Sequence, residues 1–274
     1  MSDLRDKADA LRRLHSGPRA LLLPNAWDVA SARLVEAAGF PAVATSSAGV
    51  AFALGYPDGQ RISRAEMLEM VRRIAGAVKV PVTADVEAGY GTTAQAAAET
   101  ARGVVEAGAV GMNFEDLADR AGLLPLELQV ERIKAIRAAG DAAGVPLVLN
   151  ARTDSFAVES IPAAQRADEA IRRANAYLRA GADCAFVPFV TDRDIIARLA
   201  REIGGPLNVL GVPGAPKLQE LESLGVRRVS LGGGPARAAY GRARRVAMEV
   251  RETGSFEALR DAVTYAEMQR LLSG

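Results

Sequence analysis

The chain has 274 residues, 49% of them hydrophobic and 24% charged, and a formal net charge of +1, a composition typical of a globular protein. The near-neutral charge balance predicts no nucleic-acid surface, and no apolar run approaches the roughly 20 residues that a membrane-spanning helix needs. The N-terminal segment lacks the apolar core of a secretory signal and the single cysteine, Cys184, excludes an internal disulfide, so we expect a cytoplasmic protein.

One pattern recurs along the chain: an amphipathic helical segment, a glycine that ends it, and a short apolar run. Glycine is the usual residue after the end of a helix, and nearly continuous apolar runs are typical of parallel strands buried on both faces. The predicted strands cover residues 20–25, 42–47, 80–85, 111–116, 147–153, 184–189, 207–211 and 227–232. Strands that alternate with helices in this way indicate repeated βαβ units.

Two architectures fit such a series, a closed (β/α)₈ TIM barrel and an open doubly wound sheet. Eight units in a chain of this length favour the barrel, and no early G-x-G-x-x-G follows the first strand to suggest a dinucleotide-binding sheet. Segment 252–272 is helical in pattern and lies beyond the eighth unit, so we expect a C-terminal helical extension that packs on a neighbouring subunit. No linker marks a second domain, and we predict a single domain over residues 1–274.

Polar residues collect at the carboxyl ends of the predicted strands, where barrels of this class carry their chemistry. In the segment TADVEAGYG, Asp85 and Glu87 share one face of a strand, and uncompensated they cost several kcal/mol per charge. Glu115 ends the next strand and Asp58 lies in a loop after the second, with Arg152 as the one obvious cation. A divalent cation would offset these charges. Carboxylate oxygens without His or Cys predict Mg²⁺ or Mn²⁺ rather than Zn²⁺.

The same residues have plainer interpretations. Carboxylates at strand ends often cap the next helix, and Asp116 and Asp154 need do no more than that. Arg152 can equally be a structural counter-ion.

Three further residues are less informative. The only histidine, His15, lies in a charged N-terminal helix, which predicts a surface position, whereas Cys184 is expected in the core. Trp27 follows the first strand, and a role in the pocket wall and a role in packing fit its position equally well.

Taken together, the motifs resemble those of the isocitrate lyase/phosphoenolpyruvate mutase superfamily over about Leu21 to Gly233. In chain order they are TSSAG, LGYPDG, TADVEAGYG, NFED, NARTD and LNV. The resemblance implies a Mg²⁺-dependent barrel that acts on small 2-oxo or 2-hydroxy carboxylates. It also implies a homo-oligomer, a tetramer or dimer, whose last helices exchange between subunits.

The resemblance further implies a role for each matched position. The metal would be held, directly or through water, by Asp85, Glu87 and Glu115. The substrate would be bound by Ser46, Ser47, Ala48, Arg152, Asn208 and Trp27. The catalytic candidates are Asp58, Arg152 and Tyr90, and Asp119 and Arg120 are further candidates for proton transfer.

The loop after strand 111–116 departs from the superfamily. Lyases carry a cysteine and a histidine there and mutases a lysine and an asparagine, but here the loop reads LADRAGLLP; Pro188 also replaces an expected glutamate or histidine. We expect a C–C lyase that uses a metal-stabilised enolate-like state. The alternatives are a phosphonopyruvate mutase or hydrolase, an oxaloacetate decarboxylase, and a protein that binds a 2-oxo acid without converting it.

Overall fold

The computed structural model describes residues 2–119 and 122–273, without the side chains of Ser2, Ala118 and Asp119. Within these two ranges, no helix is both long enough and apolar enough to span a membrane.

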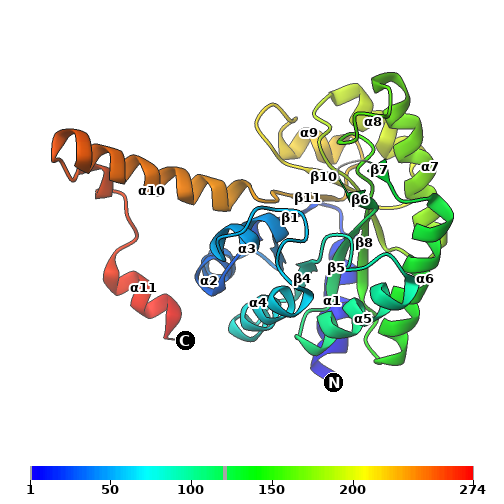
Figure 1. Cartoon of the computed structure of the whole chain (residues 1–274), viewed down its shortest axis with the longest axis horizontal. Coiled ribbons are helices and arrows are strands. Elements are labelled where there is room, and N and C mark those ends of the chain that lie inside the picture. Colours follow the sequence, from blue (N-terminus) through cyan, green and yellow to red (C-terminus); the bar gives the residue numbers. More distant parts are fainter. Residues whose placement is uncertain (1, 120–121, 274) are drawn as a thin grey trace.

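A closed parallel sheet forms the centre of the molecule. Its two outermost strands in pairing order are β1 (Leu21–Leu23) and β2 (Asn25–Ala26), which follow each other directly in the chain. β1 pairs with β11 (Arg228–Ser230) and β2 with β3 (Val43–Thr45), so a single segment joins both ends of the sheet. The break between its halves falls at Pro24, which has no N–H to donate. The predicted (β/α)₈ barrel is therefore confirmed (Figure 1).

The remaining strands occupy the predicted positions. They are β4 (Val82–Asp85), β5 (Gly111–Glu115), β8 (Val148–Arg152), β9 (Cys184–Val187) and β10 (Leu207–Leu210). A short antiparallel pair outside the barrel, β6 (Leu117–Asp119) and β7 (Gly122–Leu123), follows β5.

Helices surround the barrel (Figure 1). They are α1 (Ser2–Leu14), α2 (Val29–Ala37), α3 (Ser47–Ala53), α4 (Arg64–Ala77), α5 (Ala94–Glu106), α6 (Leu126–Ala142), α7 (Arg166–Arg179), α8 (Arg193–Glu202) and α9 (Leu218–Ser223), with a short 3₁₀ turn, η1 (Ala163–Gln165). Each longer helix turns one apolar face inward; α5, for example, buries Ala97, Ala101 and Val104, which lie on one side of a helix. All five residues of β5 are buried, which explains why the strand sequences are almost continuously apolar.

The predicted surface position of His15 is wrong. Its side chain is only 4% exposed, its Nδ1 lies 2.8 Å from the carbonyl oxygen of Leu11, and its Nε2 lies 3.4 Å from Nη1 of Arg228. Although the sequence of α1 is highly charged, the helix has an apolar face. This face packs the end of the helix against the amino ends of the strands. Cys184 is fully buried, as predicted.

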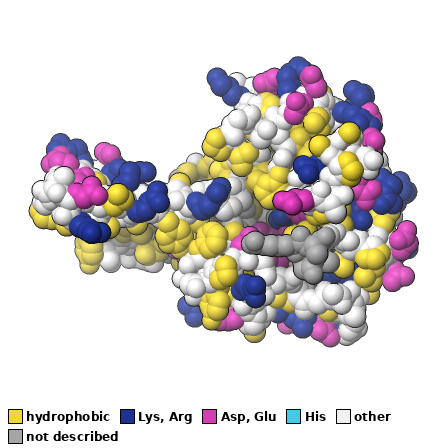
Figure 2. Space-filling view, turned by 45° about the horizontal axis from the view of Figure 1, so that its top comes forward, with side chains coloured by type: hydrophobic (Ala, Val, Ile, Leu, Met, Phe, Trp, Pro, Cys, Tyr) yellow, Lys and Arg dark blue, Asp and Glu magenta, His cyan; other side chains and the backbone are white. Residues whose placement is uncertain are grey.

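The C-terminal segment leaves the barrel. The long helix α10 (Gly234–Thr253) projects away from it, and after η2 (Glu257–Leu259) the last helix, α11 (Tyr265–Leu272), turns back toward α2 (Figure 1). Hydrophobic side chains lie along one edge of this arm (Figure 2). The exposed apolar residues of the arm are Tyr240, Met248, Val250, Phe256, Leu259, Val263, Tyr265 and Leu272.

Candidate active site

Two adjoining cavities open at the carboxyl ends of the strands, with volumes of about 260 Å³ and about 600 Å³. Eight of the predicted site residues line them: Ser46, Ser47, Ala48, Asp58, Asp85, Glu87, Glu115 and Arg152. Since Ser47, Asp58 and Arg152 line both cavities, the two form one site. The structure thus brings together residues that follow four neighbouring strands, β3, β4, β5 and β8, and lie up to about a hundred positions apart in the chain.

The two serines are already engaged within the protein. The carboxylate oxygen Oδ2 of Asp85 accepts hydrogen bonds from the Ser47 amide at 3.0 Å and from its hydroxyl at 2.8 Å. The hydroxyl of Ser46 caps α3 by accepting a hydrogen bond from the amide of Gly49 at 3.2 Å. Ser47 therefore holds Asp85 in place, and its binding of a substrate carboxylate stays a prediction.

Glu87 is the acid whose negative charge is least balanced by neighbouring groups. Its Oε2 accepts a hydrogen bond of 2.6 Å from the amide of Gln60, but its Oε1 is buried and has no hydrogen-bond partner among the described residues. Burial, followed by the negative charges of Asp85 and Asp58, raises the pKa of Glu87 to about 7. A nearby positive charge would restore the ionised form of this side chain.

Glu115 has a cation beside it. Its Oε2 lies 2.9 Å from Nη1 of Arg152, whose Nη2 also lies 2.6 Å from Oδ1 of Asp154. Burial opposes the charge of Arg152, but Asp154 and Glu115 outweigh it and hold the pKa of Arg152 above its ordinary value. The pKa of Glu115 is raised, mainly by burial, although Arg152 opposes the shift. Arg152 is thus a counter-ion, and it is also the cation that faces both cavities.

The charge and donor set fit a hydrated divalent cation better than one bound directly by three side chains. Among the described residues, no three His, Cys, Asp or Glu side chains are arranged to hold one ion. The unpartnered Oε1 of Glu87 and the mutual repulsion of the acids nevertheless fit a cation nearby. Mg²⁺ commonly binds through one or two carboxylates and keeps several water molecules. Of the three predicted ligands, Glu115 is the least available because it pairs with Arg152.

Three predicted site residues lie outside the lining of both cavities. The hydroxyl of Tyr90 is buried without a partner among the described residues, and Tyr90 lines a third cavity, of about 410 Å³, that shares Gln60 and Leu117 with the larger of the two. Asn208 is fully buried and hydrogen-bonds to Ser230, and Trp27 packs against Gly49 and the core. For Trp27, packing is therefore the role that the structure shows. The candidates Asp119 and Arg120 fall outside the described side chains.

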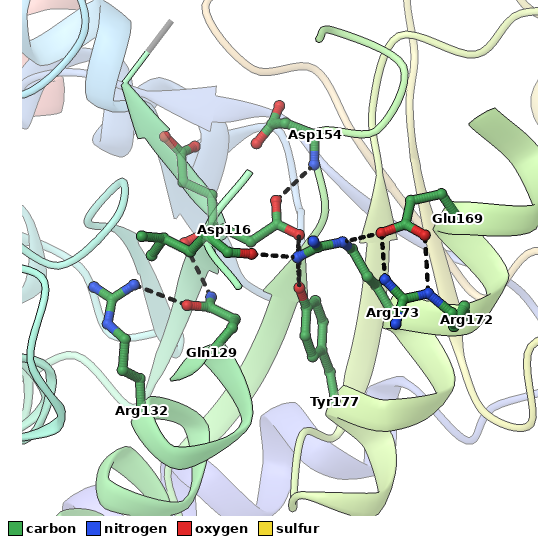
Figure 3. Close-up of polar contacts among 10 residues, drawn as sticks. Asp116, Gln129, Arg132, Asp154, Glu169, Arg172, Arg173 and Tyr177 are labelled. Carbon is green, nitrogen blue, oxygen red and sulfur yellow. Dashed lines mark hydrogen bonds and ion pairs between the residues drawn. The ribbon is translucent and has the colours of Figure 1, made fainter. Parts of the chain in front are cut away.

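Asp116 and Asp154 are not helix caps, because the N-cap positions of α6 and α7 are Pro125 and Gln165, and neither helix has a side-chain cap. Figure 3 shows Asp116 instead in a buried polar network. Its Oδ2 accepts from the hydroxyl of Tyr177 at 2.6 Å and its Oδ1 from the amide of Asp154 at 2.9 Å. The network ties the end of β5 to α7 and fixes the segment that positions Arg152.

Several residues that line the cavities were not predicted, and two of them carry functional groups of interest, Gln60 and Arg237. Gln60 lines the larger cavity and contacts Glu87. Arg237, in the first turn of α10, lines the smaller cavity and forms no side-chain hydrogen bond or ion pair within the described part of the chain. Gln60 lies directly after the LGYPDG motif, two residues after Asp58, and this proximity was its only signal in the sequence.

Known proteins resemble this chain in sequence and in fold. A 2-methylisocitrate lyase of Bacillus subtilis (strain 168) is 31% identical over an alignment of 285 residues that covers 99% of this chain and 91% of the relative. An oxaloacetate decarboxylase of Bradyrhizobium sp. (strain ORS 278) is 31% identical, with 97% and 90% covered. The crystal structure of a candidate lyase/mutase from Burkholderia cenocepacia J2315 has a TM-score of 0.94 and 40% identity, and covers 100% of this chain and 98% of its own.

The family model for phosphoenolpyruvate phosphomutase matches residues 11–251, which is most of the chain. The resemblance inferred from the motifs is therefore confirmed, and the chain belongs to the phosphoenolpyruvate mutase/isocitrate lyase superfamily.

Proposed function

We propose that the protein is a Mg²⁺-dependent lyase that cleaves a C–C bond in a small 2-hydroxy or 2-oxo carboxylate. The observation that carries this proposal is the cluster of Asp58, Asp85 and Glu87 beside Arg152 in one cavity system at the carboxyl ends of the strands. The similarity to a 2-methylisocitrate lyase supports C–C chemistry.

The chemistry requires negative charge to develop on an oxygen of the substrate. A bound Mg²⁺ supplies a Lewis acid that lowers the cost of that charge. Arg152, which stays protonated, would orient the substrate carboxylate, and the amide of Ala48 would donate to it. Asp58 lines both cavities and is the residue that we assign to proton transfer, because burial and then the nearby carboxylates hold the pKa of the Tyr90 hydroxyl far above its ordinary value.

Binding tests the cluster before any substrate is known. Isothermal titration of Mg²⁺ followed by oxalate or pyruvate should give saturable binding to the parent protein. Asp85→Asn should weaken Mg²⁺ binding at least about tenfold, whereas Asp194→Asn, at an exposed acid on α8, should leave it unchanged. Equal binding by the Asp85 variant and the parent would overturn the site assignment.

Oxaloacetate decarboxylation is the second candidate. A retro-aldol cleavage needs a base that removes the proton of the substrate hydroxyl, whereas decarboxylation releases CO₂ and leaves the enolate without that step. The loop LADRAGLLP contains no Cys, His or Lys that would assist the former, and a decarboxylase is among the relatives. Following pyruvate release from oxaloacetate and from a panel of 2-hydroxy acids separates the two, and phosphorus NMR with phosphonopyruvate tests the C–P alternatives.

We also propose that the protein is a homo-oligomer in which the C-terminal arm packs on a neighbouring subunit. The support is the arm's projection from the barrel together with its exposed apolar residues, among them Phe256 and Tyr265, 68% and 81% exposed. Multi-angle light scattering of the full chain should give a dimer or tetramer, and a monomer at micromolar concentration would count against the proposal.

A further inference from the structure

Left-handed backbone conformations concentrate around the candidate site. In the described chain, the non-glycine residues with positive φ are Gln60 (55°), Glu87 (51°), Tyr90 (56°) and Phe189 (63°). Such conformations carry a steric cost and persist only where surrounding contacts enforce them, which happens most often at functional sites. Three of the four belong to two segments that contact each other, the loop that carries Asp58 and the turn at residues 87–91.

Gln60 forms two hydrogen bonds that join these two segments. Its backbone amide donates to Oε2 of Glu87 at 2.6 Å, and its side-chain Oε1 accepts from the backbone amide of Tyr90 at 2.7 Å. The residue therefore binds one side chain and one backbone group of the turn, and it does so from a left-handed backbone conformation.

The turn that receives Gln60 is fixed from its other side. Arg132, on α6, is fully buried and donates from Nη2 to the carbonyl oxygens of Ala88 and Gly91. Its guanidinium lies over the ring of Phe114, 4.5 Å from the centroid, and the amide of Glu115 donates to the carbonyl oxygen of Glu87 at 3.0 Å. The turn thus forms a rigid platform inside the barrel mouth.

The loop that carries Asp58, on the other side of this contact, differs from the turn in its exposure and in its glycines. Residues 53–59 are exposed, and Asp58 stands between Gly55 and Gly59, whose φ values of 84° and 99° favour glycine. Gly55 follows the end of α3, where its amide donates to the carbonyl oxygen of Phe52, whereas Gly59 stands directly between Asp58 and Gln60. Only one residue, Gly59, separates Asp58 from Gln60, so the binding of Gln60 to the platform limits where Asp58 can lie.

We infer that Gln60 is a positioning residue that fastens the Asp58 loop to the turn at residues 87–91 and thereby sets both Asp58 and the carboxylate of Glu87. The part of this inference that concerns turnover rests on the proposed function, because it assumes that Asp58 acts on a substrate. The fastening itself is a property of the chain alone.

Two substitutions test the side-chain contact of Gln60 and leave its backbone contact with Glu87 possible. Gln60→Met keeps the length of the side chain and removes the acceptor for the Tyr90 amide. Gln60→Gly also removes it but relieves the steric cost of the positive φ, so a failure to fold does not confuse the result. Gln95→Met is the matched control, because Gln95 is exposed on α5 and contacts only Glu99 among the described side chains.

Hydrogen exchange measures the fastening without any ligand. The amide of Tyr90 should exchange at least tenfold faster in both Gln60 variants than in the parent, with the amide of Phe114 as an internal reference, and should not change in the control. If Tyr90 keeps its protection, the inference is overturned whatever the activity shows.

Turnover then distinguishes positioning from simple structural support. With a substrate found as described above, both Gln60 variants should lose at least tenfold in kcat while KM changes less than twofold. Faster exchange with unchanged kcat would overturn the positioning role. If the parent itself neither binds Mg²⁺ nor turns over any 2-oxo or 2-hydroxy acid, the proposed function fails, and faster exchange at Tyr90 would still support the fastening.

Discussion

The buried histidine at the base of the barrel predicts how this protein loses stability in acid. Burial, followed by the charge of Arg228, lowers the pKa of His15 from 6.5 to about 4; a hydrogen bond with the carbonyl of Leu11 and the charge of Asp183 oppose this shift, and Arg12 adds to it. Protonation of His15 in the folded state would place a second positive charge beside a guanidinium that is itself fully buried.

The direction of the effect follows from which state binds the proton. Between pH 6.5 and pH 4 the unfolded chain protonates its histidine and the folded protein does not, so the free energy of unfolding falls as the pH falls through this window. The stability that the protein gains by keeping His15 neutral is fully present above pH 6.5. Its loss amounts to about 2 kcal/mol at pH 5 and about 3 kcal/mol at pH 4, at 1.36 kcal/mol per pKa unit.

A substitution isolates this contribution from the acids of the site. Glu87, Glu115 and Asp116 have raised pKa values in the folded state, so they act in the opposite direction, and the total pH profile mixes the two. The difference in unfolding free energy between the parent and His15→Gln removes the acids from the comparison. Urea denaturation at pH 7 and pH 5 should show the parent losing about 2 kcal/mol relative to the variant.

His15 is the only histidine in the chain, so its NMR titration can be assigned without ambiguity. A titration midpoint near 6.5, or a difference between parent and variant that does not depend on pH, would refute the reasoning.

Three further outcomes are expected. Arg152→Lys replaces a guanidinium that contacts Glu115 and Asp154 with a point charge, and titration calorimetry should show oxalate affinity falling by about tenfold with the circular dichroism spectrum unchanged; undiminished affinity would remove Arg152 from the substrate site. Tyr177→Phe removes the hydroxyl that donates to Asp116 and should lower the free energy of unfolding by about 1–3 kcal/mol in urea denaturation, whereas no change would mean that water replaces it. A chain that ends at Gly254 lacks α11, and light scattering should show a smaller assembly than for the full chain; an unchanged mass would place the interface elsewhere.

The sequence predicted the barrel because its signals are local and periodic. Each strand is a short apolar run that follows a glycine-terminated helix, and Asp85, Glu87, Glu115 and Arg152 occupy strand ends where the architecture itself brings them together. The superfamily followed from the same motifs, and the comparisons confirm it.

The unpredicted features are contacts between distant segments. The hydrogen bonds from Ser47 to Asp85 and from Gln60 to Glu87 depend on how two loops meet, which periodicity does not encode. His15 was misplaced because the apolar face of a highly charged helix is narrow. The position of Asp116 and Asp154 at strand ends suits a helix cap, whereas the partner of Asp116, Tyr177, comes from α7, and Asp154 pairs with Arg152, two residues before it.

The strand divided at Pro24 also bears on how the chain is made. Leu21 pairs with Arg228, roughly 200 residues later, so the first strand emerges from the ribosome with one edge unpaired until synthesis is almost complete. Such a long separation slows closure of the barrel, since a large loop must be ordered before the pairing compensates for it. During that interval the nascent protein presents an open parallel edge, which makes it a natural client for chaperones.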